Sequence, residues 1–204
     1  MTVNWYGEGC FRIQASDFNL ISDPFSSATG LTPPRIKADI TLFTKQDLPL
    51  TSTNDDPGVI IGQGEYEMRG VRVNGFALDQ ETTDATIRSV YTVDIENVRF
   101  AFLGELTAIP DPSLLDKLGD VDVLFLPAGG KPFLNQKDAA TLIKQIEPKV
   151  IIPTFFKIPK LKIARADIRA FAEELGQKPD IHEKFTFKKK DIESLITKLV
   201  VLGV

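Results

Sequence analysis

The sequence predicts an α/β protein, with antiparallel strands in the first half and alternating helices and strands in the second. Two observations support this fold class. In the first half, short apolar and β-branched runs are separated by turns rich in Gly, Asn, Asp and Ser. In the second half, runs typical of buried strands alternate with segments of helical periodicity. Because no linker or short repeat divides the 204 residues, we expect one domain over residues 1–204.

The first half contains strands joined by short turns. Its expected strands cover residues 3–6, 10–14, 18–22, 40–43, 71–78, 86–95 and 98–103. Asn97 suits the tight turn between the last two strands, because asparagine tolerates a positive φ. Residues 26–34 are rich in Ser, Thr, Gly and Pro and predict a loop.

Residues 39–50 combine a buried strand with a polar loop that follows it directly. Ligands of α/β proteins usually bind at the carboxyl ends of strands, so we expect the functional site near this loop. Residues 51–56 are poor helix formers, which predicts a shortened or missing helix there.

The second half alternates the two kinds of element. Its expected helices cover residues 113–118, 135–146, 165–175 and 191–196, and its expected strands cover residues 121–127, 150–153, 185–187 and 199–202. Asp111 and Pro112 are expected to begin the first helix, and Asn135 is expected to cap the second. Gly176 is expected to end the third.

The composition excludes several classes of function. The net charge of −4 and the sequence pI near 5.1 argue against nucleic acid as a partner. No apolar stretch is long enough to span a bilayer, and the first residues do not resemble a signal peptide. A single cysteine fits a reducing compartment, so we expect a cytoplasmic protein without membrane contact.

Four stretches of the sequence carry a resemblance to a known family. They are Trp5-Tyr6-Gly7 with Cys10-Phe11, Asp23-Pro24-Phe25, the segment Pro-Gly-Val-Ile-Ile-Gly-Gln-Gly-Glu-Tyr-Glu at residues 57–67, and Val-Asp-Val-Leu-Phe-Leu-Pro-Ala-Gly-Gly at residues 121–130. These motifs resemble the metallo-β-lactamase superfamily, and in particular its L-ascorbate-6-phosphate lactonase-like group of Zn-dependent hydrolases. The resemblance covers nearly the whole chain. It implies a four-layer αββα sandwich, with two mixed β-sheets flanked by helices.

The resemblance also implies that the histidines of the family's metal site are missing. In the motif His-x-His-x-Asp-His, the four ligand positions are replaced by Lys45, Asp47, Pro49 and Leu50. Three further positions that are histidine in the family are Glu8, Ala108 and Phe155 in this chain. The family's bridging aspartate corresponds to Glu105.

The remaining metal-binding and nucleophilic side chains are few. A catalytic zinc site needs three or more protein ligands, usually dominated by imidazole, whereas this chain has one histidine, His182, and one cysteine, Cys10. We expect His182 to be a surface residue and Cys10 to be a small buried apolar residue. The sequence therefore predicts that no cofactor is bound, with Mg²⁺ or Mn²⁺ as the ions that carboxylates could hold.

The resemblance implies what fills the vacated pocket. Its candidate site residues are Glu8, Lys45, Asp47, Asp79, Glu105 and Phe155, with Gln80 nearby. Because carboxylates crowded without a cation repel one another, we hypothesise that the Lys45 ammonium pairs with Asp47 and Glu105 where the metal would lie. The alternative is that these side chains are simply solvated. Phe155 is expected to plug the pocket rather than to stack on a ligand.

Three functions remain open at this point. The first and preferred one is a non-catalytic binding or interaction module whose partner is a small molecule or a protein, with self-association into a homo-oligomer. The second is a hydrolase of ester, lactone or phosphoester bonds that uses a divalent ion held by Glu8, Asp47, Asp79 and Glu105. The third is a metal-free enzyme that uses Glu8 and Glu105 as an acid–base pair on a glycoside or an ester.

Overall fold

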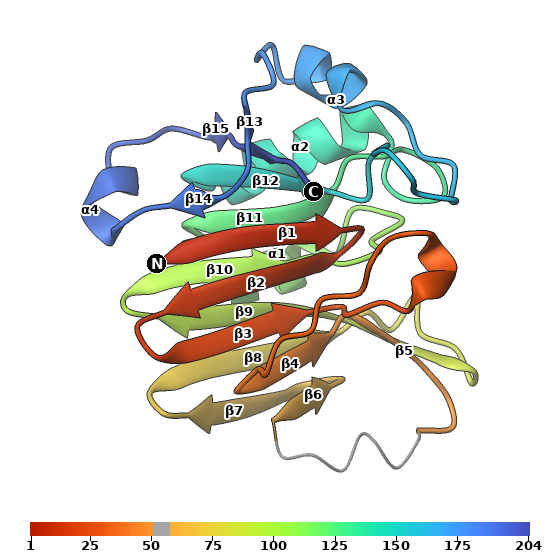
Figure 1. The fold of residues 1–204 in the computed structure, drawn as a ribbon, viewed down its shortest axis with the longest axis vertical. Helices are drawn as coiled ribbons and strands as arrows, with labels where there is room; N and C mark the ends of the chain where they lie inside the picture. The colour runs from red at the N-terminus through yellow and green to blue at the C-terminus, as the bar shows by residue number, and fades with distance from the viewer. Residues whose placement is uncertain (51–57) are drawn as a thin grey trace.

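The computed structural model describes residues 1–50 and 58–204, and in them two mixed β-sheets pack face to face (Figure 1). The six-stranded sheet has the spatial order β14 (Phe185–Thr186), β1 (Thr2–Gly7), β2 (Cys10–Ala15), β3 (Phe18–Ser22), β4 (Ile40–Phe43) and β6 (Val59–Ile61). The eight-stranded sheet has the order β15 (Lys198–Leu199), β12 (Val150–Thr154), β11 (Val123–Pro127), β10 (Val98–Phe102), β9 (Thr86–Ile95), β8 (Val71–Ala77) and β7 (Gly64–Met68), with β5 (Lys45–Asp47) paired to β9. A short pair joins β13 (Ile181–His182) to β16 (Val201–Leu202).

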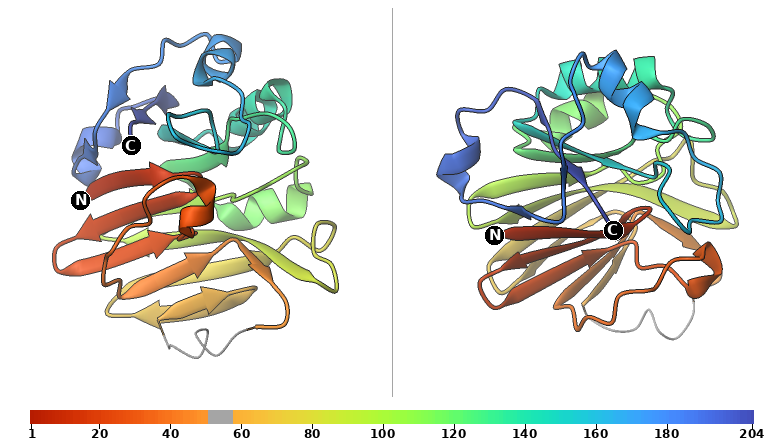
Figure 2. Two further views of the ribbon diagram at one scale, coloured as in Figure 1. Left: turned by 45° about the vertical axis from the view of Figure 1, so that its right-hand side comes forward. Right: turned by 45° about the horizontal axis from the view of Figure 1, so that its top comes forward.

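The helices gather on the outer face of the eight-stranded sheet (Figures 1 and 2). They are α1 (Pro112–Leu118), α2 (Gln136–Ile146) and α3 (Ile168–Glu174), while the short α4 (Lys189–Ile192) lies beyond β14. The six-stranded side carries the 3₁₀ turn η1 (Ser27–Thr29) and the coil around it. This arrangement confirms the predicted α/β class and the two mixed sheets of the αββα sandwich; among the described residues, the outer layer on the six-stranded sheet consists of η1 and coil.

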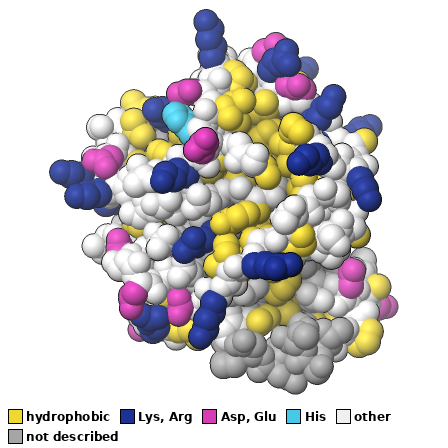
Figure 3. All heavy atoms as spheres, in the orientation of Figure 1, with side chains coloured by type: hydrophobic (Ala, Val, Ile, Leu, Met, Phe, Trp, Pro, Cys, Tyr) yellow, Lys and Arg dark blue, Asp and Glu magenta, His cyan; other side chains and the backbone are white. Residues whose placement is uncertain are grey.

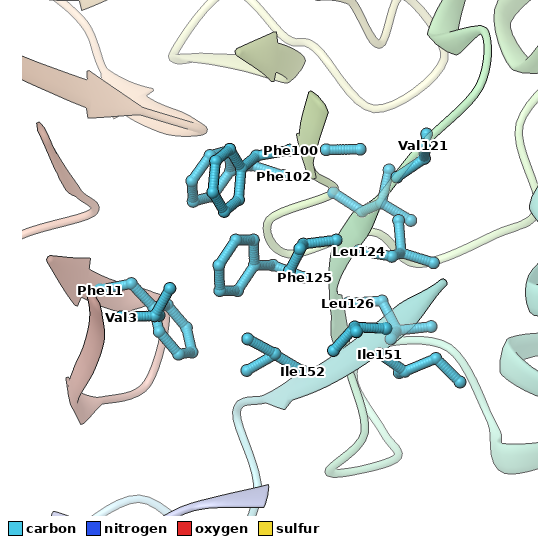
Figure 4. Packing of buried hydrophobic residues seen from close by; sticks show 14 of the residues in the cluster. Val3, Phe11, Phe100, Phe102, Val121, Leu124, Phe125, Leu126, Ile151 and Ile152 are labelled. Carbon is cyan, nitrogen blue, oxygen red and sulfur yellow. The ribbon is translucent and has the colours of Figure 1, made fainter. Parts of the chain in front are cut away.

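The core between the sheets is aromatic, and the alternation of side chains along each strand explains it. The Phe125 ring lies 4.6 Å from that of Phe11 on the opposite sheet and 4.5 Å from that of Phe102 on its own sheet, measured between centroids. Figure 4 shows these rings between the sheets, while Leu124 and Ile151 point to the opposite face, where the helices pack. Both faces of β11 and β12 are therefore buried, as is typical of parallel strands.

The helix boundaries follow their caps. Asn135 accepts a hydrogen bond from the Asp138 backbone at 2.9 Å and caps α2 as predicted. Asp111 precedes Pro112 at the start of α1, but its side chain makes no capping bond. The third helix begins at Ile168 rather than at residue 165, because Asp167 caps it and the Ala166 N–H donates instead to the Gly129 carbonyl.

The predicted loop after β4 is partly wrong. Lys45–Asp47 forms the strand β5, in which Lys45 lies opposite Arg88 and Asp47 lies opposite Thr86 of β9. The first residues of the long strand β9 extend past β10, and β5 gives them a partner. The prediction of a shortened helix at residues 51–56 falls outside the described residues.

The surface carries the single histidine, as the sequence predicts. His182 appears in cyan in Figure 3, and its Nε2 lies 3.1 Å from the Asp180 carboxylate. The same face shows hydrophobic patches scattered among lysines and arginines. Within the part of the chain that the structure describes, no helix has the length and apolar character needed to cross a membrane.

The strand directions bring several loops to one edge of the sandwich. Strands β3, β4 and β6 run parallel to one another, as do β10, β11, β12 and β15. The loops after β3, β4, β10 and β12 carry the residues that line the cleft described next, together with the turn between β1 and β2. This edge is the place where α/β proteins commonly bind ligands.

Candidate functional site

A cleft of about 240 Å³ opens at this edge. Its charged lining comes from segments far apart in the sequence, namely the β1–β2 turn, the loops after β3, β4 and β10, and residues 155–165. The residues that determine its chemistry are Glu8, Asp23, Lys45, Glu105, Phe155 and Arg165.

The structure places four of the six predicted site residues in the cleft: Glu8, Lys45, Glu105 and Phe155. Asp47 is exposed on β5, where it accepts a hydrogen bond from the Thr86 hydroxyl at 3.0 Å. Asp79 and Gln80 line a different cavity, of about 340 Å³, beside the start of α1. The expectation that Lys45 pairs with Asp47 is therefore wrong, because the strand pairing of β5 holds the Asp47 side chain against Thr86.

A buried ion pair forms one wall. The Arg165 guanidinium donates to both oxygens of Glu8, at 2.6 Å and 3.4 Å, and the two side chains are only 7% and 9% exposed. Arg165 also lies over the Phe133 ring, with its Cζ 4.7 Å from the centroid. Glu8 is thus held by a cation, which makes it unsuited to the acid–base role that the sequence suggested.

The opposite wall is a chain of charges. The Lys45 ammonium lies 3.3 Å from a Glu105 carboxylate oxygen, and an Arg88 nitrogen lies at the same distance from that oxygen. Arg88 also donates to the Glu105 backbone carbonyl at 2.9 Å and approaches the Glu81 carboxylate at 3.6 Å. This arrangement fits the internal salt bridge hypothesised for Lys45, with Arg88 as a second cation on Glu105.

Asp23 supplies the titratable carboxyl group of the cleft. Burial raises the pKa of Asp23 to about 7, against two opposing hydrogen bonds from Thr44, and the negative charge of Glu105 adds to the rise. The Thr44 N–H and hydroxyl donate to the two Asp23 oxygens at 2.7 Å and 2.8 Å. A carboxyl group with this pKa exchanges its proton near neutral pH, as a general base or acid must.

Gly9 is needed for the close packing around Asp23. A Cβ at this position would lie 2.8 Å from the Phe155 ring and 2.9 Å from an Asp23 oxygen, closer than real contacts allow. We expect Gly9→Ala to displace one of these groups and to lower the free energy of unfolding by about 1–3 kcal/mol, measured by urea denaturation. Ser113→Ala, on the rim of the other cavity, is the control and should leave this free energy nearly unchanged. A Gly9→Ala protein as stable as the wild type would contradict the packing argument.

Three residues of the cleft have a strained backbone. Glu8, Asp23 and Phe155 have φ values of 50°, 39° and 54°, in the left-handed region that residues other than glycine rarely adopt. Each such residue costs on the order of 1–3 kcal/mol, and such strain clusters at functional sites. The surrounding structure therefore holds these three residues in a backbone conformation that they rarely adopt on their own.

Phe155 is part of the core rather than a free aromatic surface. Its ring centroid lies 4.8 Å from that of Phe133, and the residue is almost fully buried. The Phe155 carbonyl oxygen would collide with any Cβ at Gly129, which explains the glycine there. Phe155 thus closes the inner end of the cleft.

Sequence reasoning missed Asp23, Arg88 and Arg165. Asp23 was noted as part of Asp-Pro-Phe, and its position at the end of a strand was a usable signal. Arg165 was assigned to a helix, and its partner Glu8 is 157 residues away, so no local pattern could reveal the pair. Cys10 is buried, and burial followed by the charge of Asp23 raises the pKa of its thiol, so it is unreactive at neutral pH.

The donor set differs from that of a zinc centre. Across residues 1–50 and 58–204, no group of three or more His, Cys, Asp and Glu side chains is arranged to hold a metal ion. The cleft carboxylates of Glu8 and Glu105 are bound by arginine and lysine side chains instead. Zinc prefers imidazole and thiolate ligands, so the described residues do not fit it.

Comparison with known proteins assigns the family. Residues 2–155 match the beta-lactamase superfamily domain, and the chain therefore belongs to this family. It is 26% identical over 180 residues to a UPF0173 protein of Pyrococcus abyssi, covering 76% of this chain and 83% of that protein. It is 22% identical over 230 residues to a UPF0173 metal-dependent hydrolase of Bacillus licheniformis, covering 92% and 100% of the two chains.

A solved structure has the same fold. A Thermotoga maritima protein assigned to the Zn-dependent hydrolases of the metallo-beta-lactamase superfamily aligns with a TM-score of 0.81 and 24% identity, over 98% of this chain and 97% of that one. This similarity confirms the metallo-β-lactamase fold predicted from the sequence motifs.

These names correct two expectations. The relatives are called hydrolases, which contradicts the preferred interpretation of a non-catalytic module. They are also called metal-dependent, and the solved neighbour is assigned to Zn-dependent enzymes, which contradicts the expectation that no cofactor is bound. Both expectations took the loss of histidines as the loss of the family's function, and the names of the relatives speak against that step.

Proposed function

We propose that this protein is a hydrolase of ester-type bonds, lactones included, and that the bond is cleaved in the cleft between Asp23 and Lys45. The observation that carries the proposal is the joint presence, in one small cleft, of a carboxyl group that titrates near neutral pH and an ammonium group. The names of the relatives support hydrolysis, and the motifs shared with the lactonase-like group support an ester-type bond.

Asp23 acts as the general base in this mechanism. Its ionised carboxylate takes a proton from a water molecule, and the water oxygen attacks the ester carbonyl carbon. The carbon–oxygen bond to the leaving group then breaks, and the protonated Asp23 returns the proton to the leaving alkoxide. The products are an acid and an alcohol, and Asp23 ends as it began.

Lys45 stabilises the negative charge that develops on the carbonyl oxygen. Its ammonium group has three N–H donors, and Glu105 is its ion-pair partner. The side chain is 37% exposed, so it can reach a substrate in the cleft. Glu105, fixed by Arg88 at two points, positions this ammonium and does not itself take part in proton transfer.

The first experiment measures ester hydrolysis by the purified protein. Ethyl acetate, ethyl hexanoate and γ-butyrolactone are followed by pH-stat titration, in protein treated with EDTA and in protein given Zn²⁺ or Mn²⁺. Turnover that is lost in the Asp23→Asn variant supports the proposal. Absence of turnover under all conditions, or activity that appears only with added metal and survives Asp23→Asn, would overturn it.

A second variant tests the role of Lys45. We expect Lys45→Met to lower kcat about 10²-fold, because one charged donor to the developing oxyanion is lost. The stability should change by less than about 1 kcal/mol, because the ion pair is partly exposed. Lys117→Met, on the rim of the other cavity, is the matched control and should leave kcat unchanged. Equal activity of Lys45→Met and the wild type would remove Lys45 from the mechanism.

Other expectations stay proposals. We place the protein in the cytoplasm on the strength of its single cysteine. One domain over residues 1–204 and a homo-oligomer are likewise proposed, and size-exclusion chromatography with light scattering tests the oligomer. A small molecule, the substrate, is the proposed partner, and the acidic composition argues against nucleic acid.

A further inference from the structure

We infer that the substrate carries a short apolar arm, which lies at the mouth of the cleft against Phe25, Phe43 and Ile163; this inference rests on the proposed ester hydrolysis. The three side chains line the cleft together with its charged groups, and we call them its mouth. Ile163 is 41% exposed, and Phe25 and Phe43 are partly exposed. A cleft lined by both apolar side chains and charged groups matches an amphiphilic molecule whose ester group is the polar end.

The mouth is held in shape by contacts between its two loops. The Lys162 N–H donates to the Thr29 carbonyl at 2.9 Å, which ties the Ile163 loop to η1. The same loop is closed on itself by a bond from the Lys157 N–H to the Ala166 carbonyl at 2.9 Å. Ile163 is therefore presented by a bonded loop, and its contact surface exists before a ligand arrives.

Gly30 lets these two segments approach. Its φ is +89°, and a Cβ there would lie 2.5 Å from the Lys160 carbonyl oxygen. A Cβ on Gly7 would collide with a methyl carbon of Leu31, the next residue in the sequence after Gly30, and would lie 3.2 Å from one of Ile158.

The volume of the cleft limits how many carbons the substrate's apolar arm can have. A volume of about 240 Å³ corresponds to roughly eight water molecules at about 30 Å³ each, part of which the ester group itself occupies. We therefore expect an arm of about four to six carbons to fill the mouth, and a longer arm to gain no further contact. Each buried methylene should raise kcat/KM about threefold to fourfold until that length is reached.

The test uses two series of esters, because the arm belongs to either the acid or the alcohol part. One series runs from ethyl acetate to ethyl octanoate, and the other runs from ethyl acetate to octyl acetate. We expect kcat/KM to rise with length up to about six carbons in one of the two series and then to level off. Hydrolysis that is independent of arm length in both series would overturn the inference while leaving the proposed function standing.

A pair of variants locates the arm. Ile163→Asn should remove the rise of kcat/KM with arm length that the wild type shows, because the apolar contact of the arm with Ile163 is lost. Ile196→Asn is the matched control, because Ile196 is 90% exposed and does not line the cleft. If Ile163→Asn keeps the wild-type length dependence, the arm does not lie at this mouth. If no ester is hydrolysed by the wild type, the proposed function itself fails.

Discussion

Asp23→Asn is expected to lower kcat/KM for ester hydrolysis by about 10²–10⁴-fold, the range that a general base contributes. Asparagine has nearly the shape of aspartate and keeps an oxygen to accept the Thr44 N–H bond, but it cannot take a proton from water. The wild-type kcat/KM should rise with pH through about 7 and then level off, because only the ionised carboxylate acts as a base. The variant should lack this rise.

The same substitution is expected to stabilise the protein at high pH. The folded pKa of Asp23, about 7, lies above its ordinary value of 3.8, so the folded chain binds this proton more tightly than the unfolded chain does. Wild-type stability therefore falls as the pH rises from about 4 to 7, by at most about 4 kcal/mol from this group. The amide of the variant does not ionise, so its free energy of unfolding lacks this pH-dependent loss. The variant's advantage in free energy of unfolding over the wild type should therefore grow from pH 4 to pH 7.

Urea denaturation at pH 4.5 and at pH 8, alongside initial rates, measures both effects. Asp84→Asn, which alters an exposed carboxylate between β8 and β9, is the matched control and should change neither quantity. A variant that loses activity and gains stability at pH 8 fits a functional group kept at the expense of stability. A variant that loses both would show that Asp23 is needed for structure and not for proton transfer.

Arg165→Met is expected to lower the free energy of unfolding by about 3–5 kcal/mol, because it leaves the buried Glu8 carboxylate without its cation. The substitution also removes the guanidinium that lies over the Phe133 ring, so the loss includes this contact as well as the ion pair. For a chain of this size, such a loss lowers the melting temperature by roughly 10 °C.

The double variant Glu8→Gln with Arg165→Met should recover most of that stability, because both charges leave the interior together. Arg169→Met, which removes an exposed arginine in α3, is the control and should change stability by less than about 0.5 kcal/mol. Calorimetric melting of the four proteins gives the comparison. A single Arg165→Met variant that melts with the wild type would show that Glu8 is solvated despite its burial.

The fold was predictable because its signals are local. The alternation in β1 to β3, the aromatic and β-branched run of β9 to β11 and the Asn135 cap each specify their element within a few residues. Where prediction went wrong, tertiary contacts decided the outcome. Lys45–Asp47 is a strand because β9 needs a partner, and α3 starts late because the Ala166 N–H is engaged by Gly129.

The site was only partly predictable for a related reason. Glu8, Lys45 and Glu105 could be placed by resemblance, since the resemblance implies that each stands at the position of a family ligand, and the structure brings all three to one cleft. Which cation neutralises which carboxylate depends on side chains from distant segments, such as Arg165 for Glu8 and Arg88 for Glu105. The titration of Asp23 depends on burial and on Thr44, neither of which a sequence pattern measures.

Each sheet is completed at one edge by a strand from near the end of the chain, β14 in the six-stranded sheet and β15 in the eight-stranded sheet. This affects the chain while it is being synthesised. β14 pairs with β1 in the six-stranded sheet, and β15 pairs with β12 in the eight-stranded sheet. During translation, β14 and β15 leave the ribosome after β1 and β12, the strands with which they pair. The nascent polypeptide must therefore wait with two unpaired strand edges, each a template for association with another copy.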